Sequence, residues 1–212
     1  MRRQAIRMNA SALFIGRKRV GRHANDADVR AVLKEYLATV TAGTGTVILD
    51  ELGLCQGDVR VDVAAVNGEL SGFEIKSPSD TLTRWPRQRR FYSRVVDRAW
   101  LVASERALAK ANPPHWWGQI AVFELDDRLA LRVVKEGAIN PSPDPLAIAK
   151  LLWRDEALEA LKNAGRAKGV ITKPRAVIWR RLIESVPLDD LRAAARAALK
   201  RRPEMIALAR ER

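Results

Sequence analysis

The stretch DVAAVNGELSGFEIK, residues 62–76, decides how the rest of the sequence is interpreted. It is rich in β-forming residues and apolar at alternate positions, yet it carries Asp62, Glu74 and Lys76 among hydrophobic neighbours. Burying a charge is unfavourable unless the charge is paired or binds a metal. The pattern therefore indicates a functional site built on strands.

The strand register decides whether the two acids meet. Asn67-Gly68 is a strong hairpin signal between two apolar runs. A two-residue turn would pair Asp62 with Phe73 and leave the acids on opposite faces. A three-residue loop, or a bulge at Gly72, shifts the pairing by one and places Asp62 across from Glu74. We expect the shifted register, with Lys76 farther along the same face and Val59, Val61 and Val63 together on the other.

Two converging carboxylates suit Mg²⁺ or Mn²⁺, which take carboxylate, water and phosphate oxygens. A neighbouring ammonium group, here that of Lys76, can orient a metal-bound water and offset charge that develops on a phosphate. The residues alone also allow a surface hairpin with an ordinary salt bridge. The flanking elements and the strong positive charge favour the site.

The spacing D-x(11)-E-x-K on a hairpin resembles the PD-(D/E)XK phosphodiesterase superfamily, which includes restriction endonucleases, resolvases and repair exonucleases. The segments ILDELG, GFEIKSPSDTL and RQRRFYSRVVDRAWLV resemble an uncharacterised bacterial branch of it. The resemblance covers residues 26–125 and implies an α/β fold with a restriction-endonuclease-like αβββαβ core on a mixed central sheet. Val61 replaces the proline that usually precedes the aspartate.

The resemblance also implies roles for single residues. Asp62, Glu74 and the Ile75 carbonyl would bind the metal, and Lys76 would position the attacking water. Glu51 would assist the metal or the water; its alternative is an acid at a strand end near Arg60. In some members the first helix supplies another acid, for which Glu35 is the candidate, although it also fits ordinary helix surface.

A basic helix is expected after this hairpin, over residues 86–97, with Pro86 in its first turn. Gln88 and Tyr92 are four residues apart and share a face of it. Their spacing resembles the Q-x-x-x-Y motif of the RecB-like exonuclease branch, where the pair helps to hold substrate and lysine. Five arginines in the region are candidates for binding phosphates: Arg84, Arg87, Arg89, Arg90 and Arg94.

The composition points to a polyanionic partner. The chain has 212 residues, a net charge of +13 and a pI near 10.7, as expected of a nucleic-acid-binding surface. No apolar run approaches the length that spans a bilayer, and no secretory signal is recognised. Cys55 is the single cysteine, so an intrachain disulfide is excluded and a cytoplasmic location is expected.

Three segments are predicted: a basic N-terminal arm over residues 1–22, a nuclease-like core over residues 23–139 and a basic helical module over residues 145–212. The arm has seven arginines and lysines and no acid. The proline-rich stretch from Asn140 to Pro145 marks the boundary. From Lys150 to Arg212 there are 16 basic and 8 acidic residues, a net charge of +8, which suggests nucleic-acid grip or a lid.

The remaining elements follow from periodicity and from turn residues. A helix is expected over 26–41 and strands over 46–52, 99–103, 119–125 and 129–134, with a short helix over 104–111. Trp116 and Trp117 are expected in the core or at a sheet edge. Beyond the boundary, helices are expected over 145–164, 173–184, 188–201 and 204–210.

Three functions remain open. The first is Mg²⁺- or Mn²⁺-dependent hydrolysis of phosphodiester bonds in DNA, as a nuclease. The second is a catalytically inactive DNA- or RNA-binding protein on the same fold. The third, a structural RNA-binding or ribosome-associated protein, leaves the strand acids unexplained. Membrane binding is not expected, and a homodimer remains an option because many superfamily members pair to cut both strands.

Overall fold

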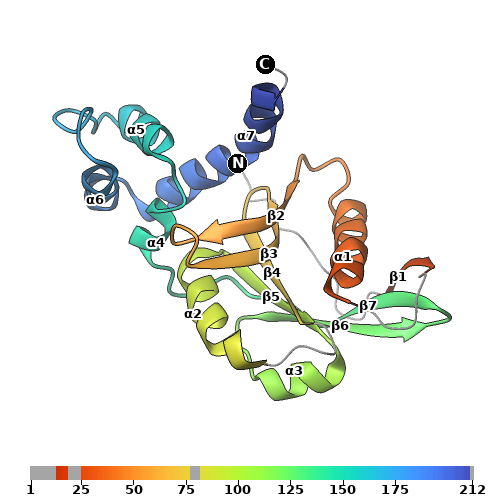
Figure 1. Ribbon diagram of the computed structural model, residues 1–212. Helices are drawn as coiled ribbons and strands as arrows, with labels where there is room; N and C mark the ends of the chain where they lie inside the picture. The colour runs from red at the N-terminus through yellow and green to blue at the C-terminus, as the bar shows by residue number, and fades with distance from the viewer. Residues whose placement is uncertain (1–12, 19–24, 77–81, 211–212) are drawn as a thin grey trace.

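A seven-stranded mixed sheet forms the centre of the computed structural model (Figure 1). The structure describes residues 13–18, 25–76 and 82–210, with the side chains of residues 13–16, 25–76 and 82–203. The strand order is β1-β7-β6-β5-β4-β3-β2, with β5 parallel to both β4 and β6 and antiparallel pairing elsewhere. The strands are β1 Leu13–Lys18, β2 Val47–Leu54, β3 Val59–Val66, β4 Leu70–Lys76, β5 Arg98–Ala103, β6 Gly118–Leu125 and β7 Arg128–Lys135. The expected α/β class is confirmed.

The hairpin of β3 and β4 has the shifted register. A three-residue loop, residues 67–69, joins the strands, and the ladder runs from Val66 opposite Leu70 to Val63 opposite Phe73. Continuing this register places Asp62 opposite Glu74. Gly72 pairs regularly with Ala64, so the loop produces the shift and not a bulge.

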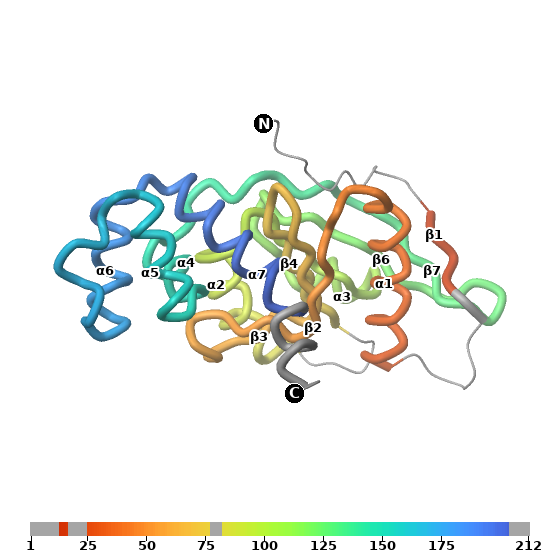
Figure 2. Tube along the Cα trace, turned by 90° about the horizontal axis from the view of Figure 1, so that it is seen from above, coloured from red at the N-terminus to blue at the C-terminus, as the bar shows by residue number. Residues whose placement is uncertain are grey.

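Helices cover both faces of the sheet (Figures 1 and 2). On one face α1 (Asp26–Val40) packs against a core cluster that includes Val63 and Phe73. The other face carries α2 (Trp85–Val95), α3 (Glu105–Ala111) and the C-terminal helices. Val59 and Val61 belong to this second cluster. The expectation that they share a face with Val63 is therefore wrong, because the regular alternation of side chains between the two faces is interrupted at Asp62.

Local sequence explains where α1 and α2 begin. Asn25 caps α1 and forms a capping box with Asp28, and the buried face of α1 consists of Val29, Val32, Leu33, Tyr36 and Leu37. Trp85 and Pro86 start α2 directly after a short 3₁₀ helix, Leu82–Arg84. Trp116 and Trp117 are both buried and contact each other's rings, as expected of core residues.

The N-terminal segment departs from the prediction. Residues 13–18, expected within an arm, form edge strand β1, which pairs antiparallel with β7. Phe14 packs against Tyr36 of α1, with ring centroids 5.4 Å apart. Since one face of the segment meets the core, it is ordered as a strand. The other residues of the predicted arm, 1–12 and 19–22, lie outside the described residues.

The C-terminal helices also differ from the prediction in their boundaries. The helix expected over 145–164 is two helices, α4 (Pro145–Ala149) and α5 (Arg154–Asn163). The helix is interrupted before Trp153, whose backbone is extended. The Trp153 N–H donates to the Glu156 carboxylate at 2.6 Å. α6 spans Arg175–Ser185. The two helices expected after it form one helix, α7 (Leu188–Arg210), which continues through Pro203.

The C-terminal helices are fastened to the sheet by buried polar contacts. Asp97, between α2 and β5, accepts a hydrogen bond from the Leu70 N–H at 2.8 Å and pairs with Arg192 and Arg196 of α7 at 3.1 and 3.0 Å. Asn140 is buried and donates its side-chain amide to the carbonyls of Ser93 and Val96. The predicted boundary segment is therefore anchored to the core at its first residue.

One further feature concerns membranes. Within the described part of the chain, no helix has both the length and the apolar character needed to cross a bilayer.

Asp97 should be a main determinant of stability. Asp97→Ala removes the carboxylate shared by the largely buried Arg192 and Arg196 and the acceptor of the Leu70 N–H, and we expect it to lower the free energy of unfolding by about 3–5 kcal/mol. Glu159→Ala is the control, because it removes a half-exposed ion pair with Arg201 and should cost less than about 1 kcal/mol. Urea unfolding measures both, and equal losses would contradict this role of Asp97.

Candidate active site

A cleft of about 500 Å³ opens where β3 and β4 stop pairing. Its walls come from the β2–β3 turn, the ends of β3 and β4, and the first turns of α1 and α2. It is lined by Asp26, Gly57, Asp58, Val59, Arg60, Asp62, Glu74, Ile75, Lys76, Arg84, Arg87 and Gln88. The predicted triplet of Asp62, Glu74 and Lys76 is therefore brought together in an open cleft.

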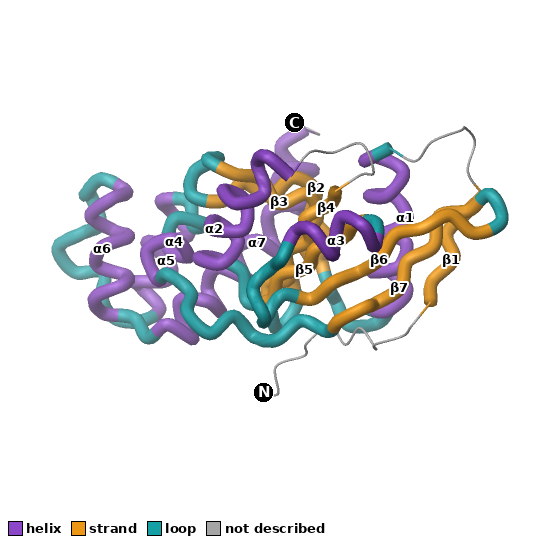
Figure 3. Tube along the Cα trace, turned by 90° about the horizontal axis from the view of Figure 1, so that it is seen from below, coloured by secondary structure: helices purple, strands orange, loops and turns teal. Residues whose placement is uncertain are grey.

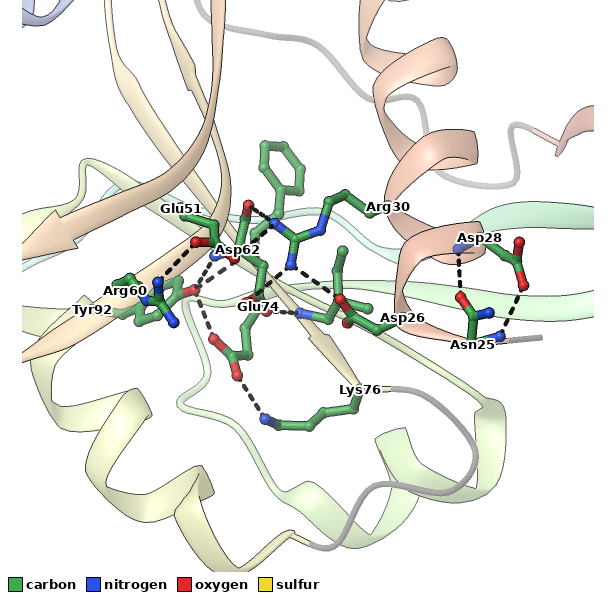
Figure 4. A network of polar contacts seen from close by, with 12 residues as sticks. Asn25, Asp26, Asp28, Arg30, Glu51, Arg60, Asp62, Glu74, Lys76 and Tyr92 are labelled. Carbon is green, nitrogen blue, oxygen red and sulfur yellow. Dashed lines mark hydrogen bonds and ion pairs between the residues drawn. The ribbon is translucent and has the colours of Figure 1, made fainter.

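Asp62 is held where the strands diverge. Its Oδ2 accepts a hydrogen bond from the N–H of Ile75 at 2.8 Å. The carboxylate therefore replaces the backbone acceptor that Ile75 would have if β3 and β4 were still paired there. Its own carbonyl accepts from Arg30 Nη1 at 2.9 Å, and its N–H donates to the Tyr92 hydroxyl at 3.4 Å. Side chains from α1 and α2 thus fix its backbone from both faces of the sheet (Figure 4).

Glu74 lies beneath the cleft with no solvent-exposed area. The Tyr92 hydroxyl donates to its Oε2 at 2.7 Å, and Lys76 Nζ donates to its Oε1 at 2.6 Å. Lys76 Nζ also donates to Gln88 Oε1 at 2.9 Å. The glutamine and the tyrosine of the predicted Q-x-x-x-Y pair therefore hold the lysine and the glutamate, respectively.

Burial shifts the proton affinities of this group. Desolvation, with a contribution from the charge of Asp62, raises the pKa of Glu74 to about 7 against the attraction of Lys76. Desolvation also raises the pKa of Asp62, although the hydrogen bond from Ile75 opposes it. The pKa of Tyr92 is raised by burial and by the Glu74 charge, so its hydroxyl remains a donor. The two acids repel each other in a poorly solvated position.

Two residues of α1 that the sequence did not single out adjoin the site. Asp26 lines the cleft, and Arg30 Nη2 lies 3.0 Å from Asp26 Oδ2 and 3.8 Å from Asp62 Oδ1. Glu35, the acid considered on this helix, is not among the cleft residues. The signal that would have found Asp26 is its place in the first turn of α1, and Arg30 follows four residues later on the same helix.

Glu51 lies between Asp50 and Leu52, which pair with Val63 and Val61 of β3, and it is outside the cleft lining. Its φ of 51° is left-handed, which is strained for glutamate. Its carboxylate is half-exposed and pairs with Arg60 at 2.8 Å, with Arg30 3.9 Å away. The contact with Arg60 is the one expected of an ordinary strand-end acid, and Arg30 links Glu51 indirectly to Asp62.

The five arginines divide into two groups. Arg84 and Arg87 line the cleft. Arg94 instead forms a two-point contact with Asp144, the N-cap of α4. Arg89 donates to the Asn112 carbonyl, and neither it nor Arg90 lines the cleft. Only the first two are placed to meet a ligand in the cleft.

The donor set fits a hard divalent cation in part. Asp62 and Glu74 both line the cleft, and desolvation raises the pKa of each carboxyl, so their ionised forms are poorly stabilised in the metal-free protein. Ile75 also lines the cleft. Among the described residues, no three His, Cys, Asp or Glu side chains are grouped as a metal site. Any metal here would need oxygens from backbone, water or substrate besides these two acids.

The raised pKa of Glu74 makes metal-free stability depend on pH. A pKa of about 7 in the folded state against 4.5 as the ordinary value means that the folded state binds this proton more tightly than the unfolded chain. Protonated Glu74 therefore raises the free energy of unfolding below pH 4.5, and this contribution is lost as the pH rises to about 7. The loss is at most roughly 3 kcal/mol.

The variant Glu74→Gln isolates this contribution. The stability of the wild type relative to Glu74→Gln should fall as pH rises through that window, measured by urea unfolding in EDTA. Glu159→Gln is the control and should show no such trend. A difference between wild type and Glu74→Gln that stays constant with pH would show that Glu74 does not titrate there.

Comparisons with known proteins place the chain without assigning an activity. The solved structure of SPO1766, a protein of unknown function from Silicibacter pomeroyi, is 20% identical and covers 63% of this chain and 89% of its own, with a TM-score of 0.37. That score is too low to establish a shared fold. A comparison with curated proteins found no match. Residues 20–208 match a family model described as Bacteriophage P4 protein cII, and the chain therefore belongs to that family.

Proposed function

We propose that the chain is a metal-dependent nuclease that hydrolyses phosphodiester bonds in DNA. The observation that carries the proposal is the meeting of Asp62, fully buried Glu74 and Lys76 at an open cleft. A purely structural role would leave the repulsion between the two acids unexplained. The order of α1, β2, β3, β4, α2 and β5 agrees with the restriction-endonuclease-like core of the PD-(D/E)XK superfamily.

A divalent cation, Mg²⁺ or Mn²⁺, would be held by Asp62, Glu74 and the carbonyl of Ile75. When bound, it would supply Lewis-acid polarisation of the phosphate and a more acidic water. Lys76 would orient the attacking water through its ammonium group, which Gln88 holds at 2.9 Å. Tyr92 would keep Glu74 in place, and Arg84 and Arg87 would bind the phosphates beside the reacting one.

A binding protein without catalysis is the second candidate. The observation that favours it is the 2.6 Å ion pair between Lys76 and Glu74, which in the metal-free protein satisfies both groups without a substrate. On this alternative the cleft arginines would bind a nucleic acid and the triplet would serve only to hold the strands.

Substitution of Lys76 separates the two candidates. With labelled single- and double-stranded DNA and Mg²⁺ or Mn²⁺, Lys76→Ala should lower the cleavage rate at least about 100-fold, because water activation and charge stabilisation are lost. EDTA should abolish cleavage by the wild type. DNA binding should persist in Lys76→Ala, as measured by fluorescence anisotropy.

The matched control is Lys34→Ala, which removes an exposed lysine paired with Asp50 on the surface and should leave the rate unchanged. Cleavage that survives both EDTA and Lys76→Ala would rule out the proposed site. DNA binding without cleavage on any of these substrates would support the second candidate.

A further inference from the structure

The basic residues of the C-terminal helices fall into two sets with different surroundings. Four arginines of α7 pair with acids: Arg192 and Arg196 with Asp97, Arg201 with Glu159 and Arg202 with Glu156. These contacts hold the helices to one another and to the sheet.

The second set lies between residues 162 and 181, from the end of α5 into α6. This segment has seven basic residues and no acid, and all seven side chains are exposed. They are Lys162, Arg166, Lys168, Lys173, Arg175, Arg180 and Arg181. In the described part of the chain, none of them forms an ion pair with an acid; Arg175 hydrogen-bonds to Gln56 and lies over the Trp179 ring.

Concentrated like charges carry an energetic cost. Side chains within one Debye length, about 10 Å at 0.1 M salt, repel one another and destabilise the compact state. The rest of the module relieves such repulsion with acids, whereas this segment does not. The missing counter-charge fits a polyanion supplied from outside, and we call residues 162–181 the cationic segment.

The cationic segment is joined to the cleft. Arg175, the first residue of α6, donates to Gln56 Oε1 at 2.9 Å. Gln56 lies in the turn between β2 and β3, and the next residues, 57–60, line the cleft. Arg60 on that rim is two-thirds exposed. The turn between β2 and β3 therefore links the cleft lining to the start of α6, and Figure 3 shows α6 at the opposite end of the molecule from β1 and β7.

We infer that the cationic segment binds the phosphate backbone of DNA outside the cleft, as an extension of the site. The inference rests on the proposed function only for its choice of DNA as the polyanion. Backbone contacts of this kind are independent of base sequence and release counterions, so they set the salt dependence of binding.

The test compares two triple variants. Lys173→Gln/Arg180→Gln/Arg181→Gln neutralises part of the cationic segment. The control Arg106→Gln/Lys110→Gln/Arg128→Gln removes the same charge from exposed positions on α3 and β7, away from α6 (Figure 1). The probe is a fluorescein-labelled DNA duplex of about 20 base pairs, with the matching single strand, in EDTA so that no cleavage occurs.

Each phosphate contact contributes about 0.9 to the slope of log Kd against log salt on duplex and about 0.7 on a single strand. The first variant should lower the slope by about 2–3 and weaken binding, and the control should change it by less than about 0.5. Equal changes in both variants, or none in either, would overturn the inference. Tighter binding of RNA or of anionic vesicles than of DNA would overturn the choice of partner.

Two further readouts separate phosphate binding by the cationic segment from a structural role of its side chains and from nuclease activity. The Tm of the first variant should equal or exceed that of the wild type, because repulsion is relieved; a lower Tm would show that these side chains stabilise the fold and would overturn the inference. Cleavage is scored separately with Mg²⁺. A reduced salt slope without any cleavage by the wild type would support the inference while refuting the nuclease, and cleavage with an unchanged slope would do the reverse.

Discussion

The geometry of the site depends on the hydrogen bonds of the Tyr92 hydroxyl. The hydroxyl binds the N–H of Asp62 and the carboxylate of Glu74 where β3 and β4 separate. Two strands that diverge in a core leave backbone groups without partners, which is costly unless side chains replace them. Tyr92, Arg30 and Asp62 itself are those replacements. The gap that opens the cleft is thus stabilised by the residues that arrange it.

The placement of charge follows from the same constraint. Lys76 pairs with Glu74, and Arg30 lies near Asp62. These cations offset only part of the cost of burying the two carboxylates. In the C-terminal helices the charges to be balanced are positive. Arginines of α7 are satisfied by acids such as Asp97, while the cationic segment has no acid of its own. The cleft is lined by four acidic and four basic side chains, whereas the cationic segment carries basic side chains alone, an arrangement that suits a cation and a polyanion together.

Much of the site was predictable because its geometry is local. The loop of residues 67–69 sets the register of β3 on β4, and a period of two then places Asp62, Glu74 and Lys76. The four-residue spacing of Gln88 and Tyr92 likewise defines one helix face. Asp26 and Arg30 were missed because their part in the site depends on how α1 crosses the sheet edge. The pairing of β1 with β7 was missed because it depends on contacts distant in sequence. The same holds for the break before Trp153, where Arg202 and Trp179 donate to the carbonyls of Leu151 and Leu152.

The sequence by itself determined the α/β class, the hairpin register and the sign of the surface charge, since turn chemistry, periodicity and composition act over a few residues or over the whole chain. Only the tertiary structure decided which arginines pair with an acid and which line the cleft. Arg94 and Arg87 look equivalent in sequence, but Asp144 binds the first and the cleft exposes the second. The physical reason is that an ion pair forms only where packing brings two charges within about 4 Å, and that packing joins segments distant along the chain.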